Sequence, residues 1–292
     1  MNTMNNNPNQ EYRLLSLHEL QSLQFNVMKL IHAFCCEQKI GYYIIGGTLL
    51  GAVRHNGFIP WDDDIDIAMK REDYERFKKL FNTSFDLSRF FLQSYSSDED
   101  FAPAMLRVCI KGTIQDLKYE KHLKKSKNTY IDIFPLDYVP KSRFLQILQC
   151  KLLKCIDKVI NLKLYRIHEN NSYAIINVKR LVSFLLRIIP LCVLQKLREK
   201  AMTMYNNTKR TFLCSTVSQY GYEKQLIKEE VYGIPTLYSF NQASFYGVSD
   251  YDAYLKQIYG THYMQVPVHA ERRVPTDVYI DVDHKNNCLL YQ

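Results

Sequence analysis

The spacing of apolar residues divides the chain into segments of different kinds. Apolar residues recur at every third or fourth position between Leu14 and Gln38, which predicts an amphipathic helix. Residues 1 to 11 are polar and rich in asparagine, and they predict a disordered tail. From Arg143 to Tyr205 the pattern is strongly helical and basic, and residues 213 to 265 return to mixed strand and helix character. The pattern therefore predicts one helical insertion between two segments of mixed structure.

A short apolar run from Tyr42 to Ile45 predicts a buried strand, and the turn Gly46-Gly47-Thr48 follows it directly. A helix is predicted from about Thr48 to His55. Glycine lets the backbone approach a ligand closely. Free N–H groups at the start of the helix, together with the Thr48 hydroxyl, can receive anionic oxygens. The turn therefore has the composition of a phosphate-binding site.

An acidic run begins at Asp62, and from Asp64 through Asp66 it alternates polar and apolar residues in the manner of a half-buried strand. Side chains two apart in a strand share a face, so Asp64 and Asp66 lie together, with Asp62 as a further candidate. Like charges on one face repel each other. A magnesium or manganese ion is the simplest compensation, because these cations prefer carboxylate oxygens and bridge to phosphates.

Two other interpretations of the acidic run are weaker. Acidic runs are commonly solvated turns or helix caps, but the alternation of Ile65, Asp66 and Ile67 argues against full exposure. A calcium loop that began at Asp62 would have Ile67 where glycine is required and Asp73 where a bidentate glutamate is required.

A third carboxylate for such a site is predicted on another strand. Asp132 lies inside a β-branched and aromatic run from Tyr130, and we expect Pro135 to terminate this strand. Asp137 follows the proline and fits a turn cap better than a catalytic position.

Composition limits the classes of protein. The chain has 292 residues and 47% hydrophobic content, which is ample for a core, and its net charge of +8 suggests anionic partners. The basic residues are scattered and match no nucleic-acid module, so we expect no nucleic-acid partner. Eight cysteines without a Cys-x-x-Cys pair, and no secretory signal, favour a reducing cytoplasm. Between Lys111 and Asn128 only His122 is a suitable zinc ligand, so we predict no zinc.

Several motifs in order resemble the LicD family, which includes bacterial phosphocholine transferases and is related to the eukaryotic fukutin group. They are GGTLLGAVRHNGFIPWDDDIDIAMKREDYERF from Gly46, YIDIFPLD from Tyr130, YDAYLKQIYGTHY from Tyr251, and Glu271-Arg272-Arg273. The resemblance implies an α/β (α+β) fold, with a nucleotidyltransferase-like mixed β-sheet core, flanking helices and a mainly helical C-terminal half. It implies a catalytic core over residues 12–140, a basic helical subdomain over 141–212, and a C-terminal mixed segment, 213–292, that completes the active site.

The resemblance also implies roles for residues. Those expected to contact donor phosphate are Gly46, Gly47, Thr48, Arg54, Arg107, Lys111, Arg272 and Arg273; those expected to ligate Mg²⁺ or Mn²⁺ are Asp64, Asp66 and Asp132. Alternatives remain for several cations. Arg54 also fits a helix-dipole partner or a surface residue, and His55 is a weaker phosphate contact. Arg107 and Lys111 lie four apart on a predicted strand, where a solvated face is the alternative. The sequence around Arg272 departs from the proline-rich form of the family motif.

By resemblance, the reaction is metal-dependent transfer of a phospho-alcohol group, phosphocholine or polyol phosphate, from a cytidine diphosphate conjugate. The acceptor is a sugar hydroxyl of a cell-surface glycan of the lipopolysaccharide, capsule or teichoic acid type. Two alternatives are a nucleotidyltransferase that transfers a nucleoside monophosphate and an inactive scaffold associated with membrane or glycan. The helical region is too interrupted to span a bilayer. We favour a subdomain packed on the core there, and keep peripheral contact with anionic membrane, suited to a lipid-linked acceptor, as the alternative.

Overall fold

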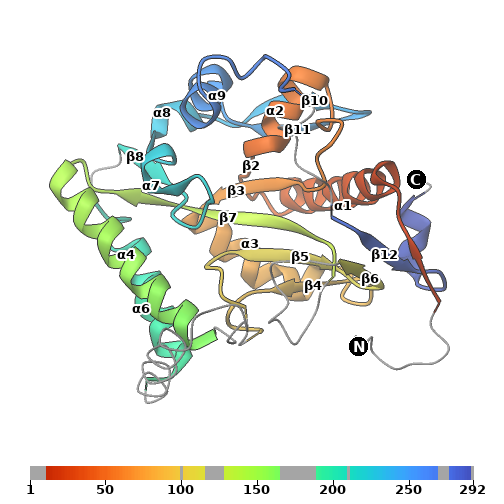
Figure 1. Cartoon of the computed structure of the whole chain (residues 1–292), viewed down its shortest axis with the longest axis horizontal. Helices are drawn as coiled ribbons and strands as arrows, with labels where there is room; N and C mark the ends of the chain where they lie inside the picture. Colours follow the sequence, from red (N-terminus) through yellow and green to blue (C-terminus); the bar gives the residue numbers. More distant parts are fainter. Residues whose placement is uncertain are drawn as a thin grey trace.

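A mixed sheet forms the centre of the molecule in the computed structural model (Figure 1). The described residues are 11–98, 101–115, 128–164, 189–208, 211–268 and 276–290. In spatial order the main path of the sheet is β10 (Thr236–Phe240), β11 (Ala243–Gly247), β2 (Tyr43–Ile44), β3 (Asp66–Lys70), β7 (Tyr130–Val139), β5 (Leu106–Ile110) and β4 (Phe90–Gln93). The far end of β7 also pairs with β8 (Phe212–Cys214), which in turn pairs with β9 (Ile227–Lys228). The fold is thus the predicted α+β type.

A smaller sheet joins the two ends of the described chain. Its order is β1 (Tyr12–Leu14), β12 (Val278–Asp281) and β6 (Thr113–Gln115), and both pairings are antiparallel. The short 3-10 helix η2 (Lys285–Leu290) follows β12 and packs beside α1 (Leu17–Glu37). Asn26 of α1 donates a hydrogen bond to the carbonyl of Leu289 at 2.5 Å, which anchors this segment.

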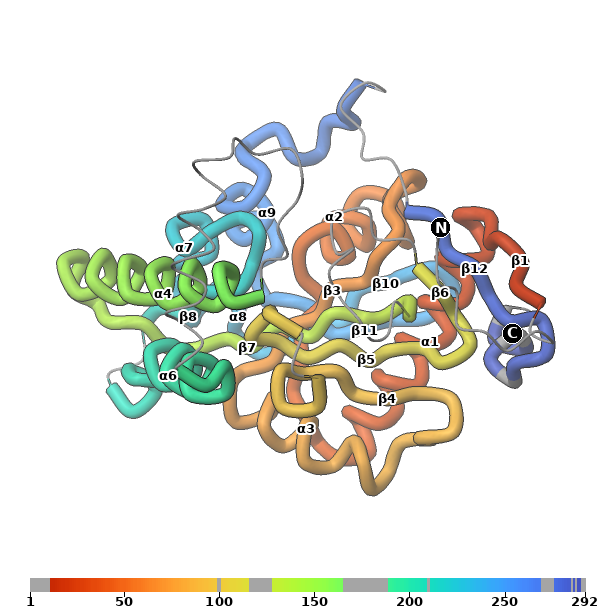
Figure 2. The backbone as a smooth tube through the Cα atoms, turned by 60° about the horizontal axis from the view of Figure 1, so that its bottom comes forward, coloured from red at the N-terminus to blue at the C-terminus, as the bar shows by residue number. Residues whose placement is uncertain are grey.

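Helices cover the central sheet on both sides. Figure 2 shows α1 and α3 (Arg71–Ser84) below strands β7 and β5, with α2 (Gly46–His55) and α9 (Tyr251–Tyr259) above. The predicted first helix forms because Ser16 and Glu19 make a reciprocal capping box at its start. Phe77 and Phe81 of α3 and Leu23 and Ile31 of α1 are fully buried in the core that these helices share with the sheet.

The remaining α-helices of the described residues lie toward the end of the molecule where β7 finishes. They are α4 (Arg143–Leu164), α6 (Leu191–Thr203), α7 (Gly221–Lys224) and α8 (Glu229–Tyr232). Helices α4 and α6 pack on each other and enclose a second apolar cluster that includes Leu153, Ile156 and Leu194. Among the described helices, none combines the length and apolar character that crossing a lipid bilayer requires.

Strand β7 is longer than predicted, because it continues through Pro135 to Val139. The N–H of Asp132 donates to the Ile65 carbonyl on the β3 side, and backbone N–H groups alternate sides along a strand. The nitrogen of Pro135 therefore faces the other side, where β5 has ended its pairing at Ile133 and β8 has not yet begun at Asp137. A proline at this position costs no ladder hydrogen bond.

Asp137 is not a turn cap, contrary to our expectation. It lies fully buried within β7, where Arg71 donates two hydrogen bonds to its carboxylate at 2.8 and 2.5 Å. Asn206 donates a third at 2.7 Å. The strand continues past the proline, so this carboxylate points into the protein and links α3 to the segment after α6.

The central sheet takes strands from both sides of the predicted boundary at Pro140. The hairpin formed by β10 and β11 joins it through the parallel pairing of Gly247 with Ile44. Residues 165–188, in the predicted helical subdomain, lie outside the described residues, as do residues 1–10 of the predicted tail.

Candidate active site

Neighbouring strands bring three predicted site residues into one row. Asp66 of β3 is the parallel partner of Asp132 in β7, and Asp132 is the antiparallel partner of Arg107 in β5. Residues directly opposite each other on neighbouring strands point to the same face, about 5 Å apart. Arg107, Asp132 and Asp66 therefore stand side by side across the sheet.

Arg107 is held by aromatic rings and by the neighbouring carboxylate. Its Nε donates a hydrogen bond to Asp132 Oδ1 at 2.9 Å, and its side chain is only 7% exposed. The guanidinium carbon lies 3.8 Å from the ring centroid of Tyr130 and 5.1 Å from that of Phe101. This contact orients Asp132, and the positive charge offsets one of the two adjacent carboxylates.

The acidic run has the alternating burial that its sequence predicted. Asp62, Asp64 and Asp66 are partly exposed, whereas Asp63 and Ile65 between them are buried. Oxygens of Asp62, Asp63 and Asp64 lie within 4.8 Å of one another, which is close enough for one cation. Strand β3 begins only at Asp66, so the first carboxylates belong to the segment that leads into it.

Asp63 has a structural role within this group. Its Oδ2 accepts a hydrogen bond from the backbone N–H of Thr276 at 2.6 Å, and its carbonyl accepts one from Gln24 at 2.9 Å. These bonds tie the acidic run to α1 and to the segment before β12. The partly exposed residues Asp62, Asp64 and Asp66 are left as the stronger candidates for metal ligation.

The glycine turn lies directly against these carboxylates. A Cβ added at Gly47 would lie 2.6 Å from Asp62 Oδ2, and one added at Gly46 would lie 3.4 Å from Asp66 Oδ2. Gly46 also has a φ of 56°, in the left-handed region that favours glycine. The structure thus brings the predicted phosphate-binding turn and the predicted metal ligands to one place.

Thr48 contacts the acidic strand instead of presenting a free hydroxyl oxygen. Helix α2 begins at Gly46, so Thr48 lies inside its first turn and is buried. Its Oγ1 accepts a hydrogen bond from the backbone N–H of Asp66 at 2.8 Å. In this arrangement Thr48 fixes the start of β3 against α2.

Arg54 lies at the end of α2 and binds backbone oxygens. One of its terminal nitrogens donates to the carbonyls of Tyr263 at 2.8 Å and Gln265 at 3.1 Å, and its Nε donates to His55 Nε2 at 3.0 Å. Burial lowers the pKa of Arg54, and burial together with the Arg54 charge lowers the pKa of His55. Arg54 thereby holds the segment after α9 near the site.

Two of the predicted cations are elsewhere or undescribed. Lys111 follows β5 and donates to the carbonyl of Leu87 at 2.8 Å. It lies four residues beyond Arg107, roughly 13 Å along the strand, so the structure does not bring it to the carboxylate row. Arg272 and Arg273 lie outside the described residues, as does His122.

Sequence reasoning missed three tyrosines that border the site. Tyr254 accepts a hydrogen bond from the backbone N–H of Gly46 at 3.3 Å, and the hydroxyls of Tyr220 and Tyr259 lie 2.8 Å apart. Burial raises the pKa of all three, and the charges of Asp66, Asp62 and Asp64 raise the pKa of Tyr220 further. They therefore remain protonated hydroxyl groups at neutral pH. The motif from Tyr251 contained two of them, but nothing in the sequence indicated Tyr220.

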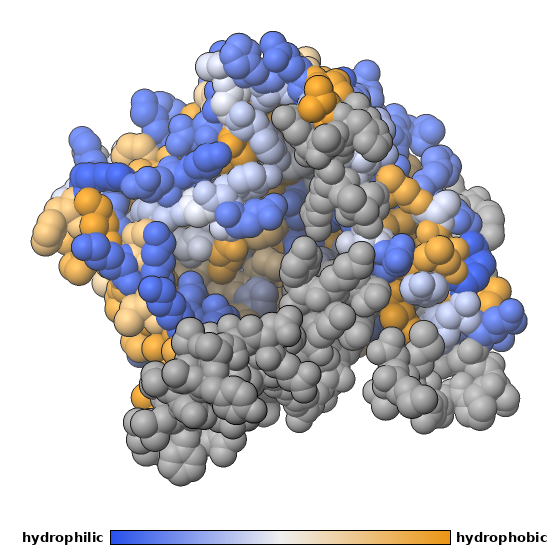
Figure 3. Space-filling view, in the orientation of Figure 1, coloured by the Kyte–Doolittle hydropathy of each residue, from blue (hydrophilic) through white to orange (hydrophobic). Residues whose placement is uncertain are grey.

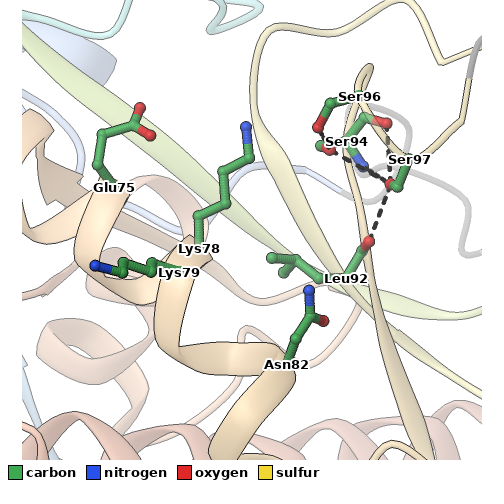
Figure 4. A pocket seen from close by; sticks show the side chains of 8 residues that line it. All are labelled: Glu75, Lys78, Lys79, Asn82, Leu92, Ser94, Ser96 and Ser97. Carbon is green, nitrogen blue, oxygen red and sulfur yellow. Dashed lines mark hydrogen bonds between the residues drawn. The ribbon is translucent and has the colours of Figure 1, made fainter.

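A polar hollow of about 350 Å³ lies between α3 and the turn after β4 (Figure 4). Its lining includes Lys78, Asn82 and Ser94, and Figure 4 shows Lys78 reaching across the opening between the helix and the serines. The Ser94 hydroxyl bonds to those of Ser96 and Ser97, and Ser97 also donates to the Leu92 carbonyl at the end of β4. This hollow contains no residue of the acidic run and is separate from the candidate active site.

Comparison with known proteins agrees with this geometry. Residues 39–148 match the LicD/FKTN/FKRP nucleotidyltransferase domain family. The chain is 28% identical over 270 residues to the lipopolysaccharide cholinephosphotransferase LicD of Haemophilus influenzae, covering 89% of this chain and 95% of that protein. It is 32% identical over 142 residues to an uncharacterised protein of Rickettsia prowazekii, covering 49% of this chain and 48% of that protein.

A shorter match reaches the eukaryotic branch. Over 41 residues the chain is 44% identical to the human ribitol 5-phosphate transferase FKRP, which is 14% of this chain and 8% of that protein. The matched domain, the similarity along most of the LicD protein, and the convergence of Gly46, Asp66 and Asp132 all agree with the family resemblance seen in the sequence. Residues 39–148 thus carry the LicD/FKTN/FKRP nucleotidyltransferase domain, and the chain is similar to a LicD phosphotransferase along most of its length.

Proposed function

We propose that this protein transfers a phospho-alcohol group from a cytidine diphosphate conjugate to a sugar hydroxyl of a cell-surface glycan, with Mg²⁺ or Mn²⁺ as cofactor. The observation that carries the proposal is the pairing of Asp66 with Asp132 beside the Gly46-Gly47 turn. Adjacent carboxylates next to close-approaching backbone suit a cation bound to a diphosphate. The names of the relatives, a cholinephosphotransferase and a ribitol 5-phosphate transferase, support phosphocholine or a polyol phosphate as the transferred group.

Asp62, Asp64, Asp66 and Asp132 have the donor chemistry for such an ion, since all four are partly exposed carboxylates. When bound, the ion would neutralise charge on the diphosphate and polarise the phosphorus to be attacked. Asp132 differs from the others because Arg107 fixes its orientation. We assign Asp132 as a metal ligand or as the base that accepts the proton of the acceptor hydroxyl.

The bond changes follow from the donor. The acceptor oxygen forms a bond to the phosphorus that carries the alcohol, and the bond from this phosphorus to the bridging oxygen breaks. The leaving group is cytidine monophosphate, and the acceptor proton passes to a carboxylate. The hydroxyl of Tyr254, and whichever of the bonded Tyr220 and Tyr259 hydroxyls accepts from the other, are protonated and available as hydrogen-bond donors to phosphate oxygens beside the turn.

The reaction is tested with purified protein, magnesium chloride and a glycan acceptor. The donor is either cytidine diphosphate choline or cytidine diphosphate ribitol. Release of cytidine monophosphate coupled to labelling of the glycan supports the proposal. Release of pyrophosphate from a nucleoside triphosphate would instead identify a nucleotidyltransferase that uses the same carboxylates. No nucleotide release from any donor, with folded protein and magnesium present, would favour the non-enzymatic scaffold.

The Asp66→Asn variant tests the site itself. Loss of one ligand charge should lower transfer on the order of a thousandfold, because an amide neutralises a cation poorly. The matched control is Asp283→Asn, an exposed aspartate in the turn after β12. Transfer by Asp66→Asn at the rate of the control would remove this carboxylate from the mechanism.

A further inference from the structure

One side of α4 exposes large apolar side chains to solvent. Phe144 is 73% exposed, Leu148 55%, Ile147 42% and Leu152 40%. These residues recur at three- and four-residue intervals, so they form one stripe along the helix. The opposite side carries Leu153, Ile156 and Ile160, which are buried in the protein. Helix α4 is therefore apolar on two sides, and only one of them is covered within the described structure.

Helix α6, which packs on α4, also exposes apolar side chains. Val193 is 49% exposed and Leu197 is 48% exposed, and they lie one helical turn apart. Figures 1 and 2 show α4 and α6 as neighbours at the end of the molecule where β7 finishes and β8 begins. In Figure 3 hydrophobic residues alternate with hydrophilic ones at this end. Exposed apolar residues that gather in this way mark an interaction surface more often than scattered ones do.

The same surface carries a strong positive charge. Its exposed lysines are Lys141, Lys151, Lys154, Lys158, Lys196 and Lys200. The two carboxylates in the described parts of α4 and α6 are already paired, since Asp157 bonds Arg198 at 3.1 Å and Glu199 lies 3.6 Å from Arg71. The lysines are therefore not neutralised by acidic groups of their own helices.

We propose that this surface of α4 and α6 docks on an anionic lipid bilayer. The apolar stripe enters the headgroup boundary, and the lysines contact the charged headgroups while their aliphatic stems lie along the apolar layer. A second copy of this chain fits less well, because two such faces would oppose like charges. The inference rests on the proposed function, because docking would bring the active site to a glycan acceptor that is linked to lipid.

Vesicle sedimentation tests the proposal with the full chain and no substrate. The protein should bind phosphatidylcholine vesicles that contain about 30 percent phosphatidylglycerol, and should bind pure phosphatidylcholine vesicles far less. The double variant Phe144→Ser/Leu148→Ser should lose at least about tenfold in the partition constant. The matched control is Ile234→Ser/Leu237→Ser, which removes apolar residues of 85% and 56% exposure from another part of the surface.

A charge variant distinguishes an anionic bilayer from another protein as the partner of this surface. Lys151→Glu should lower binding to anionic vesicles by about tenfold or more, because each lysine near such a surface contributes about fivefold and the reversal also adds repulsion. Lys79→Glu makes the same change on an exposed position of α3 and should bind as the wild type does. Equal binding of all variants would overturn the proposal. So would a concentration-dependent dimer that Phe144→Ser/Leu148→Ser abolishes.

The outcomes for membrane and catalysis are distinguishable. Vesicles without glycan report only docking, whereas transfer to a soluble glycan reports only the carboxylate site. A docking variant that retains transfer to the soluble acceptor, and loses transfer to a vesicle-bound acceptor, supports both proposals.

Discussion

Gly47 shows how closely backbone and carboxylate are packed at the candidate site. The sequence suggested that the glycines let phosphate approach the turn, and the structure shows a carboxylate oxygen already next to each of them. The place that a Cβ of Gly47 would occupy lies 2.6 Å from Asp62 Oδ2. A side chain at Gly47 would therefore displace the Asp62 carboxylate from its present position, before any ligand is considered.

A Gly47→Ala substitution should separate catalysis from stability. Alanine stabilises a helical position by up to about 1 kcal/mol relative to glycine. Its Cβ would, however, force the Asp62 carboxylate to move. We expect the transfer rate to fall by roughly tenfold to a hundredfold, because small misplacements of reacting groups cause losses of this size. The melting temperature should change little. A variant with full activity would show that the position of Asp62 does not matter for the reaction.

His32 predicts a dependence of stability on pH. Its Nδ1 lies 2.7 Å from the Tyr42 hydroxyl, and burial lowers its pKa from the ordinary value of 6.5. The unfolded chain binds a proton near pH 6.5, whereas the folded protein binds it only at lower pH. Stability should therefore fall as pH decreases from about 6.5 toward the lowered pKa, and be unaffected by His32 above that range.

Urea unfolding at about pH 7.5 and pH 5.5 measures this effect. The His32→Gln variant should lose less stability between the two conditions than the wild type does. His55, whose pKa is also lowered, supplies part of the remaining slope. An unchanged slope in the variant would mean that His32 does not contribute.

At the scale of elements, local sequence predicted the type of structure better than its extent. The helices at α1 and α2 and the strands at β2, β5 and β7 all lie where the sequence pattern placed them. Strand β7 was expected to stop at Pro135, because the sequence does not show that neighbouring strands leave a gap there. The extent of a strand depends on its partners, and those come from distant parts of the chain.

Asp137 lies on the part of β7 that sequence reasoning missed, and it predicts a large effect on stability. Asp137→Asn would weaken a fully buried, doubly bonded ion pair with Arg71. Removal of one partner of a buried pair typically costs about 3 to 5 kcal/mol. The change is measured as the free energy of unfolding in urea.

Glu75→Gln is the control for Asp137→Asn. Glu75 also lies within 3.2 Å of Arg71, but its side chain is 46% exposed, so its loss should cost at most about 1 kcal/mol. Similar losses in both variants would contradict the role given to the buried pair.

At the scale of the whole molecule, the segment that matches the family is not a closed structural unit. Residues 39–148 contain β2, β3, β4, β5 and β7, but not α1, β8, β10 or β11. Helix α1 supplies buried residues such as Leu23 and Val27 to the common core. Strand β11 covers the edge of β2.

A fragment of residues 39–148 should therefore fail to fold. Its amide spectrum should show poor dispersion, and protease should digest it much faster than it digests the full chain. A well-dispersed spectrum from the fragment would show that the strands and helix from outside it are dispensable.

The candidate site was predictable where its residues are close in sequence, and less so where they are not. The alternation from Asp64 to Ile67 and the glycines before it could be read directly, and the β-branched and aromatic run around Asp132 indicated the third carboxylate. The partnership of Arg107 with Asp132 and the position of Tyr220 depend on strand register and on the return of a distant segment. Periodicity carries no information about such long-range pairings.

Pairing of β1 with β12 has a consequence for the order of synthesis. Tyr12 is opposite Asp281, so β1 can pair only after a strand much later in the chain has been synthesised. Strand β2 waits in the same way for β11. Until β11 and β12 have been synthesised, the nascent chain carries unpaired strand edges, which promote aggregation. Fast elongation, or a chaperone that shields these edges, should raise the yield of correctly assembled protein.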